Sequence, residues 1–188
     1  IAGNQINLQG AQGPVINPSG DVHQIYNNIT VLPPRPTIDL AEAQQQLERL
    51  PLDRVPEPAP VPPNSRVQLS ANPFFVGRES DLKTLAAILK QGTPAIAAAT
   101  GMGGIGKTQL ASEFVHRYGQ YFAGGVYWLS FAEADGVESE IVACGTAMDL
   151  PGFAALDFPK QVARVRQIWQ EPVPRLLLFD NCEDEALL

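Results

Sequence analysis

An octapeptide at residues 101–108, Gly-Met-Gly-Gly-Ile-Gly-Lys-Thr, restricts this 188-residue chain to few folds. It follows a short uncharged run, Ala95–Thr100, whose small side chains fit a strand that is covered on both faces. It precedes apolar residues at helical spacing from about Lys107 to Tyr118, and Gly119 ends that pattern. A strand that turns through a glycine-rich loop directly into a helix predicts an α/β domain with a parallel sheet.

Further strand and helix patterns alternate along the chain. Strands are predicted at Val126–Phe131 and Arg175–Asp180, where apolar residues run together, and helices at Arg78–Lys90, Val137–Met148 and Pro159–Trp169. Strands that alternate with helices imply a parallel sheet with right-handed crossovers. We therefore expect an α/β fold with the doubly wound parallel sheet and flanking helices of nucleotide-binding domains.

The octapeptide has the pattern G-x-x-x-x-G-K-[ST], and its residue types suit a phosphate group. Its glycines let the loop curl with N–H groups pointing at the anion, and the following helix N-terminus favours negative charge. Lys107 adds a positive charge for phosphate oxygens, and the Thr108 hydroxyl is expected to bind Mg²⁺. The predicted cradle consists of Gly101, Met102, Gly103, Gly104, Ile105, Gly106, Lys107, Thr108 and Gln109.

A metal held by Thr108 calls for a carboxylate at the end of a neighbouring buried strand. Asp180 directly follows the apolar run Leu176–Phe179, which suits the centre of a sheet. The sequence therefore predicts Thr108 and Asp180 as the metal ligands. The alternative is that Asp180 only caps the turn that follows it.

Residues 73–188 resemble the nucleotide-binding domain of STAND-class signalling P-loop NTPases, the NB-ARC type found in NLR-like bacterial regulators. The resemblance rests on Phe75–Glu79 (FVGRE), Gly101–Ala111 (GMGGIGKTQLA) and Leu176–Asn181 (LLLFDN). It implies ATP or ADP with Mg²⁺ as ligands, and it implies that Val76, Gly77 and Arg78 line the adenine and ribose side of the site. A further implication is that effector and sensor domains, and the remaining strands of the domain, lie outside this sequence.

One position departs from that family. Many members carry a second acid directly after the metal-binding aspartate, where this chain has Asn181. An amide cannot accept a proton at neutral pH, although it can hold a water molecule. With Lys107, Asp180 and Asn181 as the catalytic candidates, we expect slow ATP hydrolysis, unless Glu183 or Asp184 takes the role of the missing acid.

The first 72 residues differ in composition from the rest, since 11 of the 17 prolines precede residue 70. Residues 1–31 contain short β-prone triplets between Gly, Pro, Asn and Ser, and they resemble the amyloid-type signalling motifs found ahead of such NTPases. A loosely structured or disordered tail is the alternative. Residues 32–72 are predicted to be a proline-rich linker with one short helix around Leu40–Leu50.

Charge and composition exclude several classes of function. Thirteen basic against 20 acidic side chains give a net charge of −7, so we expect neither nucleic-acid nor anionic-membrane binding. Two cysteines without CxxC spacing favour a reducing compartment, and the sequence contains no apolar run of about 20 residues that could span a bilayer. We expect a cytoplasmic protein, and we interpret the sequence, which begins with Ile1, as an excerpt of a longer polypeptide.

The sequence is compatible with three functions. The first is an ATP/ADP switch in which nucleotide exchange controls homo-oligomerisation. The second is an ordinary phosphotransferase or ATPase on the same fold, and the third is an interaction module with a structural nucleotide. Rapid ATP turnover that is independent of oligomeric state would favour the enzyme, and fibres seeded by residues 1–31 alone would favour the module.

Overall fold

A computed structural model describes residues 38–91, 106–132 and 136–181, all of which belong to the compact unit Pro34–Leu188. Four of the predicted features lie outside these described residues: the β-prone segment 1–31, the strand Ala95–Thr100, the loop residues Gly101–Ile105, and the acids Glu183 and Asp184.

The described strands form a two-stranded parallel sheet. Strand β1 (Val126–Ser130) pairs with β2 (Leu176–Asp180) in a register that sets Val126 against Leu176 and Ser130 against Asp180. The parallel arrangement and both strands confirm the prediction, with each strand one residue shorter than expected. Because the strands are parallel, their carboxyl ends meet at one edge of the sheet, where Ser130 and Asp180 lie side by side.

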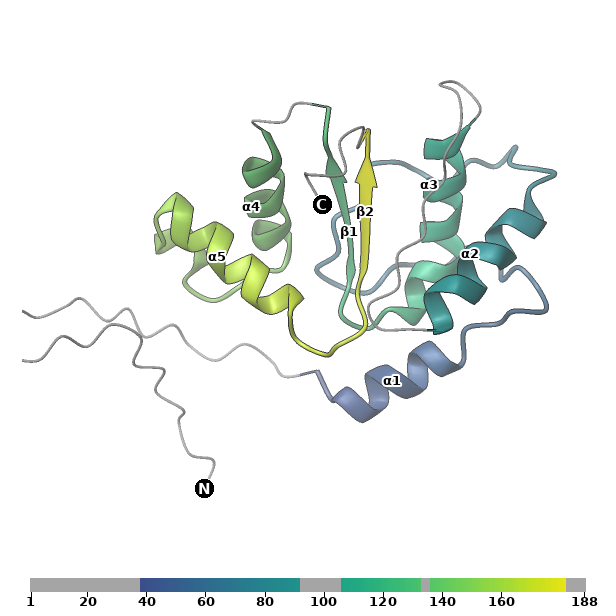
Figure 1. The fold of residues 1–188 in the computed structure, drawn as a ribbon, viewed down its shortest axis with the longest axis horizontal. Helices are drawn as coiled ribbons and strands as arrows, with labels where there is room; N and C mark the ends of the chain where they lie inside the picture. Colours follow the sequence, from purple (N-terminus) through teal and green to yellow (C-terminus); the bar gives the residue numbers. More distant parts are fainter. Residues whose placement is uncertain (1–37, 92–105, 133–135, 182–188) are drawn as a thin grey trace, which may run out of the picture. The chain divides into compact units, whose positions relative to one another are not determined.

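Helices cover both faces of this sheet (Figure 1). Helices α2 (Glu79–Gln91) and α3 (Lys107–Tyr118) lie on one side, and α4 (Val137–Ala147) and α5 (Phe158–Trp169) lie on the other. All four were predicted within two residues at each end. Two short 3-10 turns, η1 (Gly119–Tyr121) and η3 (Phe153–Ala155), follow α3 and precede α5.

Side-chain alternation along the strands explains why two separate cores form. Val126 and Trp128 of β1 face the α2 and α3 layer, whereas Tyr127 and Leu129 face the α4 and α5 layer. Burial of residues on both faces is what parallel strands with helical crossovers require, so β1 has no polar face in its first four positions.

Local sequence chemistry sets the helix boundaries. The side chain of Asp157 accepts a hydrogen bond from the Lys160 backbone N–H and so caps α5. Inside α4, Gly145 allows a close approach to α5, because a Cβ at this position would lie 2.5 Å from Val165 Cγ2 and 2.3 Å from Phe153 Cζ. The packing of α4 against α5 therefore depends on a glycine inside α4.

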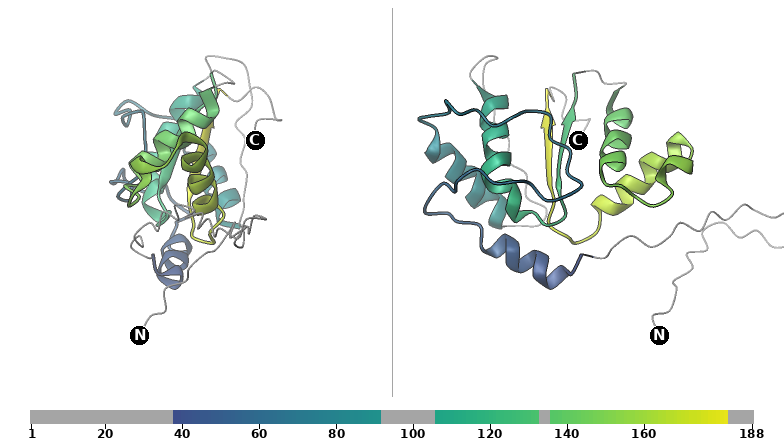
Figure 2. Two further views of the ribbon diagram at one scale, coloured as in Figure 1. Left: turned by 90° about the vertical axis from the view of Figure 1, so that its left-hand side faces the viewer. Right: turned by 180° about the vertical axis from the view of Figure 1, so that it is seen from behind.

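The amino-terminal part of the described chain packs against the domain. The predicted short helix is present as α1 (Leu40–Glu48), capped by the Asp39 side chain, and it buries Ala43. Residues 54–70, which we call the strap, run from α1 to the edge of β1 (Figure 2, right). The interpretation of residues 32–72 as a linker did not include this packing, in which Val61, Val67 and Leu69 lie against the core between the sheet and α3.

Across the part of the chain that the structure describes, every helix is too short or too polar to cross a bilayer.

Candidate functional site

The site begins where α3 begins. Gly106, the residue before the helix, has φ = +80°, in the left-handed region that side chains with a Cβ rarely adopt. It provides no side-chain cap, so the first-turn N–H groups of α3, beginning with Lys107 and Thr108, have no capping oxygen from this residue. A helix start of this kind carries partial positive charge and suits an anion.

The two predicted metal ligands are in direct contact. Thr108 Oγ1 donates a hydrogen bond to Asp180 Oδ1 over 3.1 Å, although the residues are 72 positions apart. The same carboxylate oxygen accepts the backbone N–H of Asn181 at 3.1 Å. Asn181 itself has φ = +58°, a conformation that Asn and Asp adopt more readily than most residues. The carboxyl end of β2 and the start of α3 therefore converge at one point.

Residues from the predicted adenine side reach the same region. Arg78 Nη1 donates to the Gly106 carbonyl at 3.3 Å, and Arg78 Nε pairs with Asp81 at 2.7 Å. Gly77 has φ = +80°, which explains the need for glycine there. Val76, together with Phe74, is almost fully exposed, at 79% and 84%. The FVGRE element thus contacts the end of the glycine-rich loop through Arg78 and leaves apolar side chains uncovered beside it.

The remaining predicted cradle residue in the described chain is Gln109. It is exposed, and its Oε1 accepts a hydrogen bond from Asn72 Nδ2 at 3.4 Å. The described cradle residues, Gly106, Lys107, Thr108 and Gln109, occupy consecutive positions at the start of α3.

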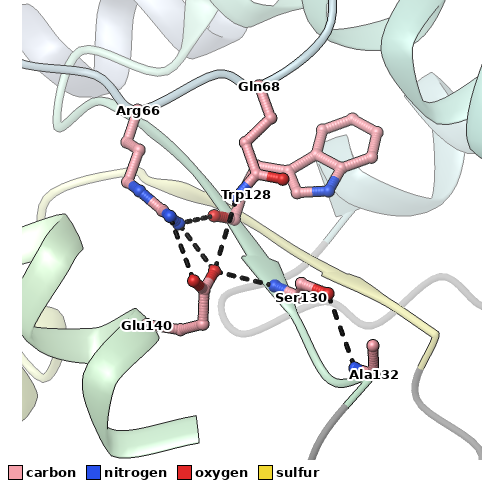
Figure 3. A network of polar contacts seen from close by, with 6 residues as sticks. All are labelled: Arg66, Gln68, Trp128, Ser130, Ala132 and Glu140. Atoms are coloured by element: carbon pink, nitrogen blue, oxygen red, sulfur yellow. Dashed lines mark hydrogen bonds and ion pairs between the residues drawn. The ribbon is translucent and has the colours of Figure 1, made fainter. Parts of the chain in front are cut away.

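A polar network at the end of β1 was missed at the sequence level (Figure 3). Glu140 of α4 accepts hydrogen bonds from Arg66 of the strap at 2.8 and 3.1 Å, and from the Ser130 N–H at 3.0 Å. The amide of Gln68 lies within hydrogen-bonding distance of this pair. Ser130 is paired with Asp180, and paired residues of parallel strands point to the same face, so its side chain shares the α3 side of the sheet with Asp180.

The network perturbs the pKa values of its members. Burial favours the neutral form of Glu140, but the hydrogen bonds from Arg66 and from the Ser130 N–H outweigh it and hold the pKa of Glu140 below its ordinary value. The hydrogen bonds to Glu140 also raise the pKa of Arg66. Burial raises the pKa of the neighbouring Cys144 thiol to about 11, so the thiol is neutral near physiological pH. The pair is therefore ionised, and the thiol beside it contributes no charge.

Thr108 and Asp180 fit a magnesium ion chemically. Both present hard oxygen donors, and Mg²⁺ usually takes one or two protein ligands while substrate phosphates and water complete its octahedral shell. Within residues 38–91, 106–132 and 136–181, no group of three or more His, Cys, Asp and Glu side chains gathers in a metal-binding arrangement. A magnesium ion held by these two residues would have coordination positions left for phosphate oxygens and water.

Comparison with known proteins gives one relevant similarity. The chain is 30% identical over 193 residues to the regulatory protein AfsR of Streptomyces griseus, with 94% of this chain covered. The chain spans only 19% of that protein's length. No family model matches the chain, and no solved structure matches it. The described architecture is a mixed α/β fold with a small parallel sheet, compatible with part of a P-loop domain, and the similarity to a regulatory protein fits a signalling role.

Proposed function

We propose that this chain contains the nucleotide-binding part of a STAND-type, NB-ARC-like signalling switch, which binds ATP or ADP with Mg²⁺. The observation that carries the proposal is the contact between Thr108 and Asp180 over 3.1 Å. It brings together Thr108, the last residue of the glycine-rich motif, and an acid at the carboxyl end of β2, as binding of a magnesium–phosphate group requires. The similarity to a regulatory protein supports the signalling role.

Each described residue has a distinct task in this proposal. The N–H groups at the start of α3 and the Lys107 ammonium hold the phosphate oxygens, while Thr108 and Asp180 hold the metal. Arg78, which contacts the carbonyl of Gly106, fixes the loop end relative to the adenine side. Bound Mg²⁺ would neutralise charge that develops on the phosphates. Asn181 can orient a water molecule but cannot deprotonate it, which favours slow hydrolysis and a long-lived nucleotide state.

Switching follows from differential binding. The two nucleotides must differ in affinity for a closed and an oligomerising form, because a ligand shifts an equilibrium only by that difference. We assign ADP to the closed form and ATP with Mg²⁺ to the oligomerising form. ATP turnover that is rapid and unaffected by oligomeric state would instead support a phosphotransferase or ATPase.

Calorimetric titration of the full chain with ATP and ADP tests the proposal. Lys107→Ala is expected to remove most of the nucleotide affinity, because one charge that contacts the phosphates is lost, while the sheet stays folded. Lys160→Ala is the matched control, since Lys160 is exposed on α5 and pairs only with the nearby Asp157 among the described contacts. Equal affinities of the wild type and Lys107→Ala would refute the assignment of the phosphate site.

A further inference from the structure

The strap is attached to the domain by a few localised contacts. It pairs with β1 at one position, where the Arg66 N–H donates to Val126 O and the Trp128 N–H donates to Arg66 O, both at 2.8 Å. The pairing does not continue toward the amino terminus, because Asn64 is left-handed at φ = +63° and the Val126 N–H donates to the Ser65 side chain instead. None of residues 54–70 is fully buried. A segment with so few backbone hydrogen bonds opens at a lower free energy than the core strands.

Helix α3 provides the second set of attachments. His116 Nε2 lies 2.8 Å from Leu69 O, and Arg117 Nη1 donates to Pro56 O at 3.0 Å. The Ala59 N–H donates to the backbone carbonyl of His116 at 2.8 Å. The helix whose first residues belong to the candidate phosphate site thus holds the strap along its last two turns.

The carboxylate of Glu140 joins the strap to the edge of the sheet where the candidate site lies. Its Oε2 accepts both from Arg66 Nη1 at 2.8 Å and from the Ser130 N–H at 3.0 Å (Figure 3). Ser130 is in turn the β1 partner of Asp180. The position of the last β1 residue beside Asp180 is therefore set by the same oxygen atom that holds the strap.

The chain that follows the strap also returns to the site. Asn72 contacts Gln109 at 3.4 Å in the first turn of α3, and Arg78 contacts the Gly106 carbonyl at 3.3 Å. Arg78 thus contacts the residue that precedes α3 directly. Arg66 is linked to the β1 partner of Asp180 only through Glu140, which accepts the Ser130 N–H.

We propose that the strap is a nucleotide-responsive element, latched to the domain by the Arg66–Glu140 pair, and that its docking and the binding of Mg²⁺–nucleotide strengthen each other. The inference rests on the proposed nucleotide-binding function and adds the route by which the nucleotide state reaches the residues ahead of the strap. Because coupling between two sites is reciprocal, a bound nucleotide must hold the strap more tightly if a docked strap favours the nucleotide. Glu140 acts as a positioning residue in this scheme.

Amide hydrogen exchange of the full chain measures the coupling. The Ala59 and Arg66 amides are the reporters, since both donate hydrogen bonds only when the strap is docked. With saturating nucleotide and Mg²⁺, we expect their exchange to slow by about tenfold, within the usual range for coupled sites. Amides of α5 serve as an internal reference for overall stability.

Two substitutions on α4 separate the latch from a general effect of charge. Glu140→Gln removes the carboxylate, whereas Glu138→Gln removes an exposed carboxylate two residues away, 3.9 Å from Arg166. We expect Glu138→Gln to retain the nucleotide-dependent slowing and Glu140→Gln to lose most of it. Arg66→Lys keeps the positive charge but cannot form the two-point contact, and it takes the place of Glu140→Gln if that variant loses protection in α5.

Nucleotide binding is measured on the same samples, so the outcomes are distinguishable. Wild-type chain that binds nucleotide without any change in strap exchange would overturn the coupling and leave the proposed function intact. Glu140→Gln and Arg66→Lys that respond as strongly as the wild type would overturn the latch assignment. Wild-type chain that binds no nucleotide would refute the proposed function and this inference with it.

Discussion

The Arg66–Glu140 pair should contribute to stability in a way that depends on pH, and Glu140→Gln measures this. The carboxylate accepts three hydrogen bonds of 2.8 to 3.1 Å, and the two charged side chains are only 21% and 22% exposed. Exposed ion pairs contribute about 0.2–1 kcal/mol, whereas removal of one partner from a buried pair costs about 3–5 kcal/mol. A pair that is one-fifth exposed falls between these limits, so we expect a loss of about 2 kcal/mol on substitution.

The sign of the pH dependence follows from the depressed pKa of Glu140. A carboxyl group whose folded pKa lies below its ordinary value of 4.5 stabilises the folded state above that pH and loses this contribution as the pH falls through the folded pKa. Arg66 and the Cys144 thiol, its other ionisable neighbours, do not titrate in that range, because both of their pKa values are raised. The difference between wild type and Glu140→Gln should therefore be complete at neutral pH and shrink in acid below pH 4.5.

Urea unfolding of the wild type and of Glu140→Gln at neutral and acidic pH provides the assay. In thermal unfolding, the same loss of about 2 kcal/mol would correspond to a decrease of roughly 4–8 °C in Tm for a domain of this size. Glu138→Gln, which removes an exposed carboxylate from the same helix, should change stability by less than about 1 kcal/mol at either pH. Equal stabilities of the two glutamine variants at neutral pH, or a difference that does not shrink in acid, would refute the reasoning.

Three further predictions concern the site and the strap. Asp180→Ala should retain ADP binding but lose the magnesium dependence of ATP binding, because one of the two metal-ligand candidates is removed. Calorimetry with and without Mg²⁺ checks this, and an unaltered magnesium response would exclude Asp180 from the site. Asn181→Asp should raise ATP turnover by about tenfold or more, since a base is restored at a left-handed position that Asp tolerates; unchanged turnover in a phosphate-release assay would contradict this. Gly119→Ala should destabilise the domain by about 1 kcal/mol, because the new Cβ would lie 3.0 Å from Val61 Cγ1 of the strap. A urea midpoint equal to that of the wild type would show that the strap moves away from the new methyl group without a measurable loss of stability.

Much of the fold could be predicted because its signals are local. The helix α3 has the predicted bounds, since its apolar spacing and the flanking glycines Gly106 and Gly119 lie within one short window. The sequence predicted Thr108 and Asp180 as ligands of one metal ion, which requires the two side chains to lie close together, and they are in contact at 3.1 Å. That part of the candidate site follows from a motif together with a rule of topology.

The network around Glu140 could not be predicted in the same way. Glu140 lies in the first turn of α4, where an acid is ordinary, and Arg66 lies 74 positions earlier in a proline-rich stretch. His116 lies in the last turn of α3, where nothing in the local pattern indicates a partner, yet it is half-buried and contacts Leu69 O of the strap. A local pattern cannot reveal which distant carbonyl or carboxylate a polar side chain will meet.

Within residues 38–91, 106–132 and 136–181, the sequence by itself determined the order of helices and strands and their parallel pairing, because helical and strand periodicity and glycine placement act over a few residues. Only the tertiary structure decided that the proline-rich residues 54–70 pack against the domain. The backbone carbonyls of Arg54 and Pro56 accept hydrogen bonds from Tyr118 and Arg117. These donors lie more than 60 positions away and become available only when α3 is packed against the sheet.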